Sequence, residues 1–131
     1  MGFDQYHEPP EELSAETRSF ARLAASLEEE AQAIGWYAQR LDVEQDPEAR
    51  AIMLDAQGEE FKHFAMDLEY LLRRTPRWRE ICEGVLFQDG DIVEHGEDSE
   101  ASATDDAGIA GGSGGAAHAG LGIGSLKGEG R

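Results

Sequence analysis

Three side chains of the types that bind divalent cations lie on helix faces that should be buried. Glu30 sits in the stretch "LEEEAQAIGWYAQRL", close to the line of apolar residues that includes Ile34. Glu60 and His63 are three residues apart in "EEFKH", a spacing that places both on one side of a helix. Carboxylate oxygens and imidazole nitrogens are ligands for Fe(II) and would also accept Mn, Zn or Ca. The sequence therefore predicts a metal site where two helices meet.

Each of these residues also has a purely structural explanation. Glu30 could extend to solvent, Glu60 could be a surface residue beside Glu59, and His63 could be a hydrogen-bonded core histidine. An unpaired carboxylate in a helix seam costs on the order of several kcal/mol or takes up a proton, and a bound cation removes that cost. The three residues together, on facing helices, favour the metal site over three separate structural roles.

Two long helices are expected to position these residues. The first opens at Ser14, a suitable N-cap, and its apolar residues recur at helical spacing as far as about Leu41. The second opens with an N-cap aspartate followed by proline, Asp46 and Pro47, and continues to about Arg74. Only a few residues join them, so they should form an antiparallel hairpin.

A shorter third helix follows, and no segment alternates as a strand would. Thr75 and Pro76 repeat the start signal before "RWREICEGVLF", which should end near Gly84 or shortly after. Trp78 is expected to pack against its neighbours, and the single cysteine, Cys82, to be a half-buried helical thiol outside any internal disulfide. The fold class is therefore all-α.

The chain carries half of a recognisable ligand set. Di-iron carboxylate bundles use one Glu from each of two helices and a Glu-x-x-His pair from each of two others. Glu30 supplies one element of the first kind, and Glu60 with His63 supplies one of the second. A two-fold symmetric dimer would complete the four-helix arrangement and cover the apolar stripes as well.

Composition changes after the helices and limits the partners. The helical domain should span residues 14–87, after a flexible arm at 1–13 and before an acidic and glycine-rich linker at 88–120. A formal charge of −17 over 131 residues argues against nucleic acid and anionic membranes as partners. No run of about 18 apolar residues and no secretory signal pattern is present, so a cytoplasmic location is expected.

The motifs together resemble a known family. "LEEEAQAIGWYAQR", "GEEFKHFAMDLEYLLRR" and the C-terminal "LGIGSLKG" are similar to the encapsulated ferritins, cargo proteins of bacterial encapsulin nanocompartments. The resemblance covers the chain from about His7 to Phe87 and then the tail. It implies a ferritin-like four-helix arrangement completed by dimerisation, and a ferroxidase with a di-iron centre at the dimer interface. It also implies that the dimers assemble into an annular decamer of chains inside an encapsulin shell in the bacterial cytoplasm.

The resemblance also implies roles for individual residues. Glu30, Glu60 and His63 match the iron ligands of the family. Trp36 and Tyr37 match aromatic residues beside the centre, and Tyr37 would be a hydrogen-bonding or redox neighbour or a seam aromatic. Among the remaining matches, Glu29 corresponds to an acid on the metal's approach route, whereas Gln32 stands where the family usually has a second acid.

The tail restores an apolar pattern after the linker. Short apolar triplets in tails are often incidental, but the resemblance identifies residues 121–131 as a targeting peptide that docks on the inner wall of the shell. Its glycines would allow close backbone approach, and the matching residues are Leu121, Gly122, Ile123, Gly124, Ser125 and Leu126.

Two other functions remain open on the residues alone. A structural helical hairpin could use its seam charges to fix dimer register without any metal. A metal-buffering protein would bind iron without turning it over, and the sequence does not separate that function from an oxidase.

Overall fold

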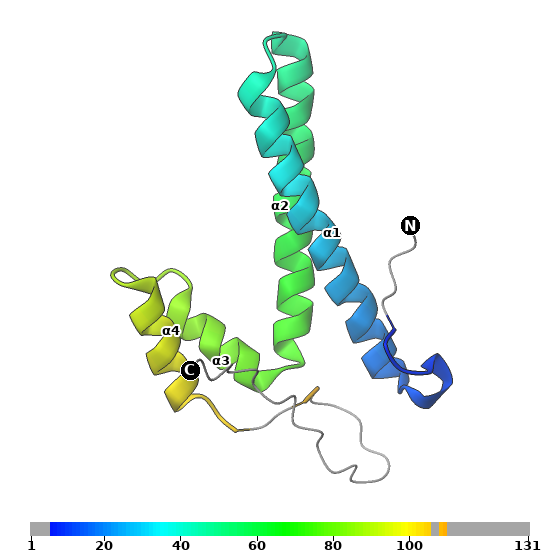
Figure 1. Ribbon diagram of the computed structural model, residues 1–131, viewed down its shortest axis with the longest axis vertical. Coiled ribbons are helices and arrows are strands. Elements are labelled where there is room, and N and C mark those ends of the chain that lie inside the picture. The colour runs from blue at the N-terminus through cyan, green and yellow to red at the C-terminus, as the bar shows by residue number, and fades with distance from the viewer. Residues whose placement is uncertain (1–5, 106–107, 110–131) are drawn as a thin grey trace, which may run out of the picture.

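The computed structural model describes residues 6–105 and 108–109, and every regular element in those ranges is helical (Figure 1). This confirms the all-α prediction. None of the helices in this part of the chain is both long and apolar enough to cross a membrane. The elements, in chain order, are a 3₁₀ turn η1 (Pro10–Glu12), α1 (Ala15–Val43), α2 (Pro47–Arg73), α3 (Pro76–Val85) and α4 (Ile92–Ser102).

The long helices α1 and α2 begin at the residues that the sequence predicted. The Ser14 hydroxyl accepts a hydrogen bond from the Thr17 amide at 3.1 Å, and the Asp46 carboxylate accepts one from the Ala49 amide at 2.8 Å. Each bond satisfies a backbone N–H that the first helical turn leaves without a partner. Pro47 at the first position of α2 lacks an amide hydrogen that would otherwise need one.

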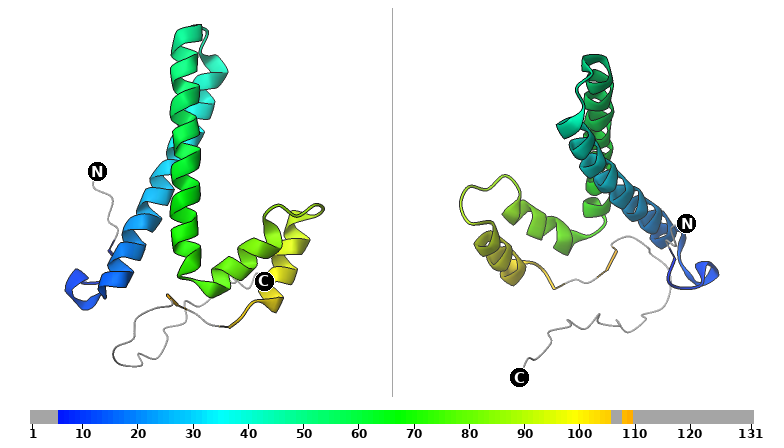
Figure 2. Two further views of the ribbon diagram at one scale, coloured as in Figure 1. Left: turned by 180° about the vertical axis from the view of Figure 1, so that it is seen from behind. Right: turned by 45° about the horizontal axis from the view of Figure 1, so that its top comes forward.

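α1 and α2 form the predicted antiparallel hairpin. Figures 1 and 2 show them side by side near the turn and diverging toward their other ends. Side-chain donors tie the two helices together, since Arg50 donates to the Leu41 carbonyl and Gln57 Nε2 donates to the Ile34 carbonyl at 3.2 Å. The hairpin thus has fixed polar contacts from its turn down to its middle.

The apolar core of the single chain is small and lies toward the ends of the hairpin. Among the described residues only Leu41, near the turn, and Leu71 and Leu72, at the end of α2, are buried apolar side chains. Ten large apolar side chains are between 42% and 102% exposed, which is typical of a surface that another molecule covers. They are Trp36, Val43, Ile52, Leu54, Phe61, Met66, Leu86, Phe87, Ile92 and Val93.

The predicted third helix is present as α3, with Cys82 half-buried as expected. A fourth helix, α4, is a correction, because residues 88–120 were predicted to be linker from position 88 onward. The start signal of α4 is Asp91, whose carboxylate accepts from the Glu94 amide at 3.0 Å. The segment has few apolar residues and an internal glycine, so its composition concealed a helix that packing against α3 stabilises.

α3 and α4 form a second, shorter hairpin (Figures 1 and 2). The Glu80 carboxylate accepts hydrogen bonds from the Thr104 amide at 2.6 Å and the Thr104 hydroxyl at 2.8 Å. Arg77 donates to the Thr104 carbonyl at 3.0 Å from the same side of α3. These contacts fasten the end of α4 to α3, so residues 92–105 belong to the folded part of the chain.

The remaining predictions about chain organisation fall partly outside this description. The targeting peptide at 121–131 and the linker residues 110–120 lie outside the described residues, as do residues 1–5 of the predicted N-terminal arm. Within that arm the structure describes the turn η1.

Close packing of α3 against α4 at Gly84 gives the first testable prediction. A Cβ atom at Gly84 would lie 1.9 Å from Ser99 Oγ and 2.8 Å from Ser99 Cβ, so Gly84→Ala should displace α4. We expect a loss of about 1–3 kcal/mol in the free energy of unfolding, the usual cost of overpacking, measured by urea titration. Gly96→Ala in α4 is the matched control, because no atom lies within 4 Å of its Cβ position and alanine favours helix. Equal stability changes in the two variants would contradict the packing of α4 on α3.

Candidate metal centre

The three predicted ligands meet in the middle of the hairpin. Glu30 lies halfway along α1, and Glu60 and His63 lie halfway along α2, so an antiparallel pair brings them to the same level. One potential ligand atom from each residue lies within 4.8 Å of those of the other two. The Nδ1 atom of His63 is 3.9 Å from Oε2 of Glu60, as expected for residues one helical turn apart. Glu30 and Glu60 are half-buried and His63 is exposed.

Burial and neighbouring acids disfavour the ionised form of Glu30. Burial raises the pKa of its carboxyl group, and a hydrogen bond with Asp67 and the negative charges of Asp67, Glu60 and Glu29 raise it further, to about 7. None of these groups is basic. The charged form of Glu30 therefore lacks the opposite charge that stabilises a buried carboxylate, and a divalent cation would supply it.

Asp67 is a neighbour of this site that the sequence analysis did not assign. It lies on α2 one turn beyond His63 and two turns beyond Glu60, so its helical position faces the same way. The side-chain oxygens Glu30 Oε2 and Asp67 Oδ2 are both buried and have no hydrogen-bond partner among the described residues when ionised. Two carboxyl groups can form a hydrogen bond only if one holds a proton. The spacing of Glu60, His63 and Asp67 on one face was the signal that could have found it.

The other predicted residues surround the cluster on α1. Tyr37 is two turns from Glu30 on the same face and is half-buried, with the Arg40 guanidinium 5.2 Å from its ring centre. Trp36 is 53% exposed, so it does not pack within the single chain. Glu29 and Gln32 are also exposed, on the surface next to Glu30.

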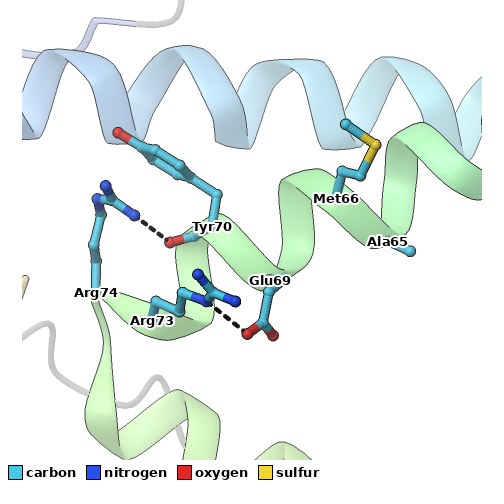
Figure 3. Close-up of a pocket in the computed structure, with 6 residues that line it drawn as sticks. All are labelled: Ala65, Met66, Glu69, Tyr70, Arg73 and Arg74. Carbon is cyan, nitrogen blue, oxygen red and sulfur yellow. Dashed lines mark hydrogen bonds and ion pairs between the residues drawn. The ribbon is translucent and has the colours of Figure 1, made fainter.

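A groove near the far end of α2 is separate from this centre. It has a volume of about 490 Å³ and is lined by Ala65, Met66, Glu69, Tyr70, Arg73 and Arg74 (Figure 3). Its charged groups already have partners. Arg73 Nε donates to Glu69 at 2.8 Å, and the Arg74 guanidinium lies 3.5 Å from the centre of the Tyr70 ring. The buried side-chain oxygens without a hydrogen-bond partner among the described residues belong to Glu30 and Asp67, and neither residue lines this groove.

The donor set fits a divalent cation, and one chain supplies part of a coordination shell. Two carboxylates and one imidazole are hard and borderline ligands suited to Fe(II), Mn or Zn. Three side chains leave positions open for further ligands, and His63 is exposed to solvent in the single chain. The buried oxygen of Glu30 without a donor is the observation that most favours a cation here.

The chain is similar to proteins of known class. The sequence profile of the EncFtn-like family matches residues 5–89. An encapsulated ferritin-like protein from Rhodospirillum rubrum is 43% identical over 131 aligned positions, covering 94% of this chain and 88% of that protein. A ferritin-like protein from Thermotoga maritima is 43% identical over 96 residues, covering 73% of this chain and 84% of its own. A crystal structure from Nitrosomonas europaea superposes with a TM-score of 0.65 at 39% identity, covering 68% of this chain and 99% of that one.

The raised pKa of Glu30 predicts how the stability of the metal-free chain depends on pH. The folded state binds the Glu30 proton more tightly than the unfolded state does, so this contribution to stability is full below about pH 4.5 and is lost as pH rises through about 7. Glu30→Gln removes the titrating group. After chelation, the variant should be more stable than wild type at pH 8 and gain much less at pH 4.5, as measured by urea titration. If the stability difference between Glu30→Gln and wild type were the same at both pH values, the pKa of Glu30 would not be raised in the folded chain.

Proposed function

Because this chain belongs to the EncFtn-like family, we propose that it is a ferroxidase that oxidises Fe(II) to Fe(III) at a pair of metal positions. The observation that carries the proposal is the convergence of Glu30, Glu60 and His63 at the middle of the hairpin. The resulting ferric iron would enter a stored mineral. Iron is the substrate here, and other divalent cations would compete for the same ligands.

Each ligand has a distinct part in this reaction. Glu30 and Glu60 would hold or bridge the two metal positions with carboxylate oxygens, and His63 would provide one imidazole for each. Two bound Fe(II) ions supply two electrons to dioxygen or peroxide. Tyr37 would orient groups beside the centre by hydrogen bonding or take part in electron transfer. Glu29, Gln32 and Trp36, on the exposed surface nearby, would line the metal's approach.

The site would be completed by a second copy of the chain. One chain contributes one Glu helix and one Glu-x-x-His helix, which is half of the four-helix ligand set. The exposed apolar side chains and the small core support the same association, because a two-fold dimer would cover them. We propose that such dimers assemble into an annular decamer, as the family resemblance implies.

The competing functions differ in what they require of the buried carboxylates. A hairpin that only used its charges to fix dimer register would need a basic partner for Glu30, and within the single chain the groups that shift its pKa are all acidic. A metal-buffering protein would use the same ligands as an oxidase. Oxidation of Fe(II) under air separates it from the proposed enzyme.

The proposed location is the lumen of an encapsulin shell in the bacterial cytoplasm. The Rhodospirillum rubrum relative is described as encapsulated, and its alignment spans 94% of this chain, well beyond the residues of the helical domain. The tail motif Leu121–Leu126 would bind the shell wall, and the preceding glycine-rich segment would act as a tether. The high negative charge of the chain would repel nucleic acid and anionic lipid, so neither is proposed as a partner.

Ligand substitutions should separate the centre from its surroundings. Glu60→Ala and His63→Ala each remove one ligand per metal, so aerobic Fe(II) oxidation followed by ferric absorbance should fall at least tenfold. Glu59→Ala is the matched control, because Glu59 is an exposed neighbour of Glu60 that pairs with Lys62, and it should retain activity. Light scattering of the same samples should show that Fe(II) promotes association of wild type and the control more than of Glu60→Ala. Full activity in Glu60→Ala would disprove the site.

Shell binding should be separable from oxidation. Deletion of residues 121–131 should abolish co-purification with a co-expressed encapsulin, while the isolated protein still oxidises Fe(II). The control replaces the deleted segment with a glycine-serine stretch of the same length, which should also fail to enter the shell. Encapsulation of either truncated or replaced chain would rule out a targeting role for the tail.

A further inference from the structure

Asp67 contributes a negative charge beside the ligand cluster that the ligand set of Glu30, Glu60 and His63 does not include. It is half-buried on α2, and its Oδ2 atom is buried without a hydrogen-bond donor among the described residues. The buried Glu30 Oε2 atom has no donor either, and of the neighbouring acids Asp67 raises the pKa of Glu30 the most, through a side-chain hydrogen bond and its charge. The two carboxyl groups therefore face each other from α1 and α2.

Basic side chains of the described chain do not neutralise this pair. Lys62 pairs with Glu59 on the exposed side of α2, and Arg73 pairs with Glu69 farther along the helix. The acids Asp67, Glu60 and Glu29 are the charged groups that act on Glu30. A buried oxygen without a donor is expensive to maintain, so its retention calls for a ligand that compensates it.

We propose that Asp67 is an auxiliary anionic residue of the metal centre, which faces Glu30 and stabilises bound cations through its negative charge. The inference rests on the proposed function and concerns the same site. Asp67 would act through Glu30, as a positioning residue, because it lies outside the group whose ligand atoms converge within 4.8 Å. Outer carboxylates that contact a metal ligand commonly strengthen metal binding in this way.

The charge balance of a dimeric site suggests what Asp67 would favour. Glu30 and Glu60 from two chains supply four negative charges, which match two Fe(II) ions. Asp67 from both chains raises the total to six, which matches two Fe(III) ions. A fixed negative charge in a partly buried site stabilises the more highly charged ion more strongly. Asp67 should thus retain metal more tightly and lower the reduction potential of bound iron.

The decisive variant is Asp67→Asn, which removes the charge and keeps the shape. Its amide can donate a hydrogen bond to Glu30, so the metal-free protein should melt at the same temperature as wild type or higher. Binding of Zn²⁺ alone, measured by calorimetry, should weaken tenfold to hundredfold. The reduction potential of the iron-loaded variant should be higher than that of wild type. Asp55→Asn, an exposed position on the same helix, is the matched control and should change neither quantity.

The outcomes distinguish this inference from the proposed function. Tight Zn²⁺ binding by wild type with an unchanged affinity and potential in Asp67→Asn would overturn the role of Asp67 and leave the ferroxidase proposal standing. A lower melting temperature of metal-free Asp67→Asn, with affinity restored to the wild-type value once folding is ensured at low temperature, would assign Asp67 a structural role and also overturn it. Failure of wild type to bind either Zn²⁺ or Fe(II) would overturn both proposals.

Discussion

Glu30 of α1 faces Asp67 and Glu60 of α2 at the middle of the hairpin, and every group that shifts its pKa is an acid. Burial and these acids raise the pKa of Glu30 to about 7, so without a cation its carboxyl group keeps a proton to a higher pH than an exposed glutamate does. With a cation the same oxygens become ligands, and their repulsion becomes attraction to a common charge. Other contacts of the hairpin hold these acids close together despite their repulsion.

The hairpin tolerates the acids because contacts on either side of the cluster stabilise it. At the turn, the hydrogen bond from Arg50 to the Leu41 carbonyl and the burial of Leu41 fasten α1 to α2. At the far end of α2, Leu71 and Leu72 are buried and the Thr75 hydroxyl donates to the Leu71 carbonyl at 3.0 Å. The middle of the hairpin can therefore carry unfavourable charge without unfolding, as strained functional sites generally do when the surrounding structure is secure.

The sequence predicted the elements whose signals are local. The starts of α1 and α2 were predictable because each depends on single residues, namely Ser14 for α1 and Asp46 with Pro47 for α2. The cluster was predictable in part because the three-residue spacing of Glu60 and His63 places both on one helix face. Tertiary contacts determine the rest. α4 depends on its packing against α3 and on bonds between Glu80 and Thr104, which its glycine-containing, acidic sequence does not reveal. Helical spacing places Asp67 on the face of Glu60 and His63, but its contact with Glu30 joins two helices, and helical periodicity alone does not predict such a contact.

A second copy of the chain would complete both the apolar core and the candidate metal centre. Among the described residues only three leucines are buried apolar side chains, which is a small core, and the three candidate ligands number half of those that a di-iron bundle uses. An apolar surface alone would associate whether or not metal were present, and a fully formed site within one chain would bind metal without association. In the proposed dimer, acids in the middle of an apolar seam would link the two events, because the second chain would bring both apolar cover and more negative charge. Association is then favourable to the extent that a cation is there to offset that charge.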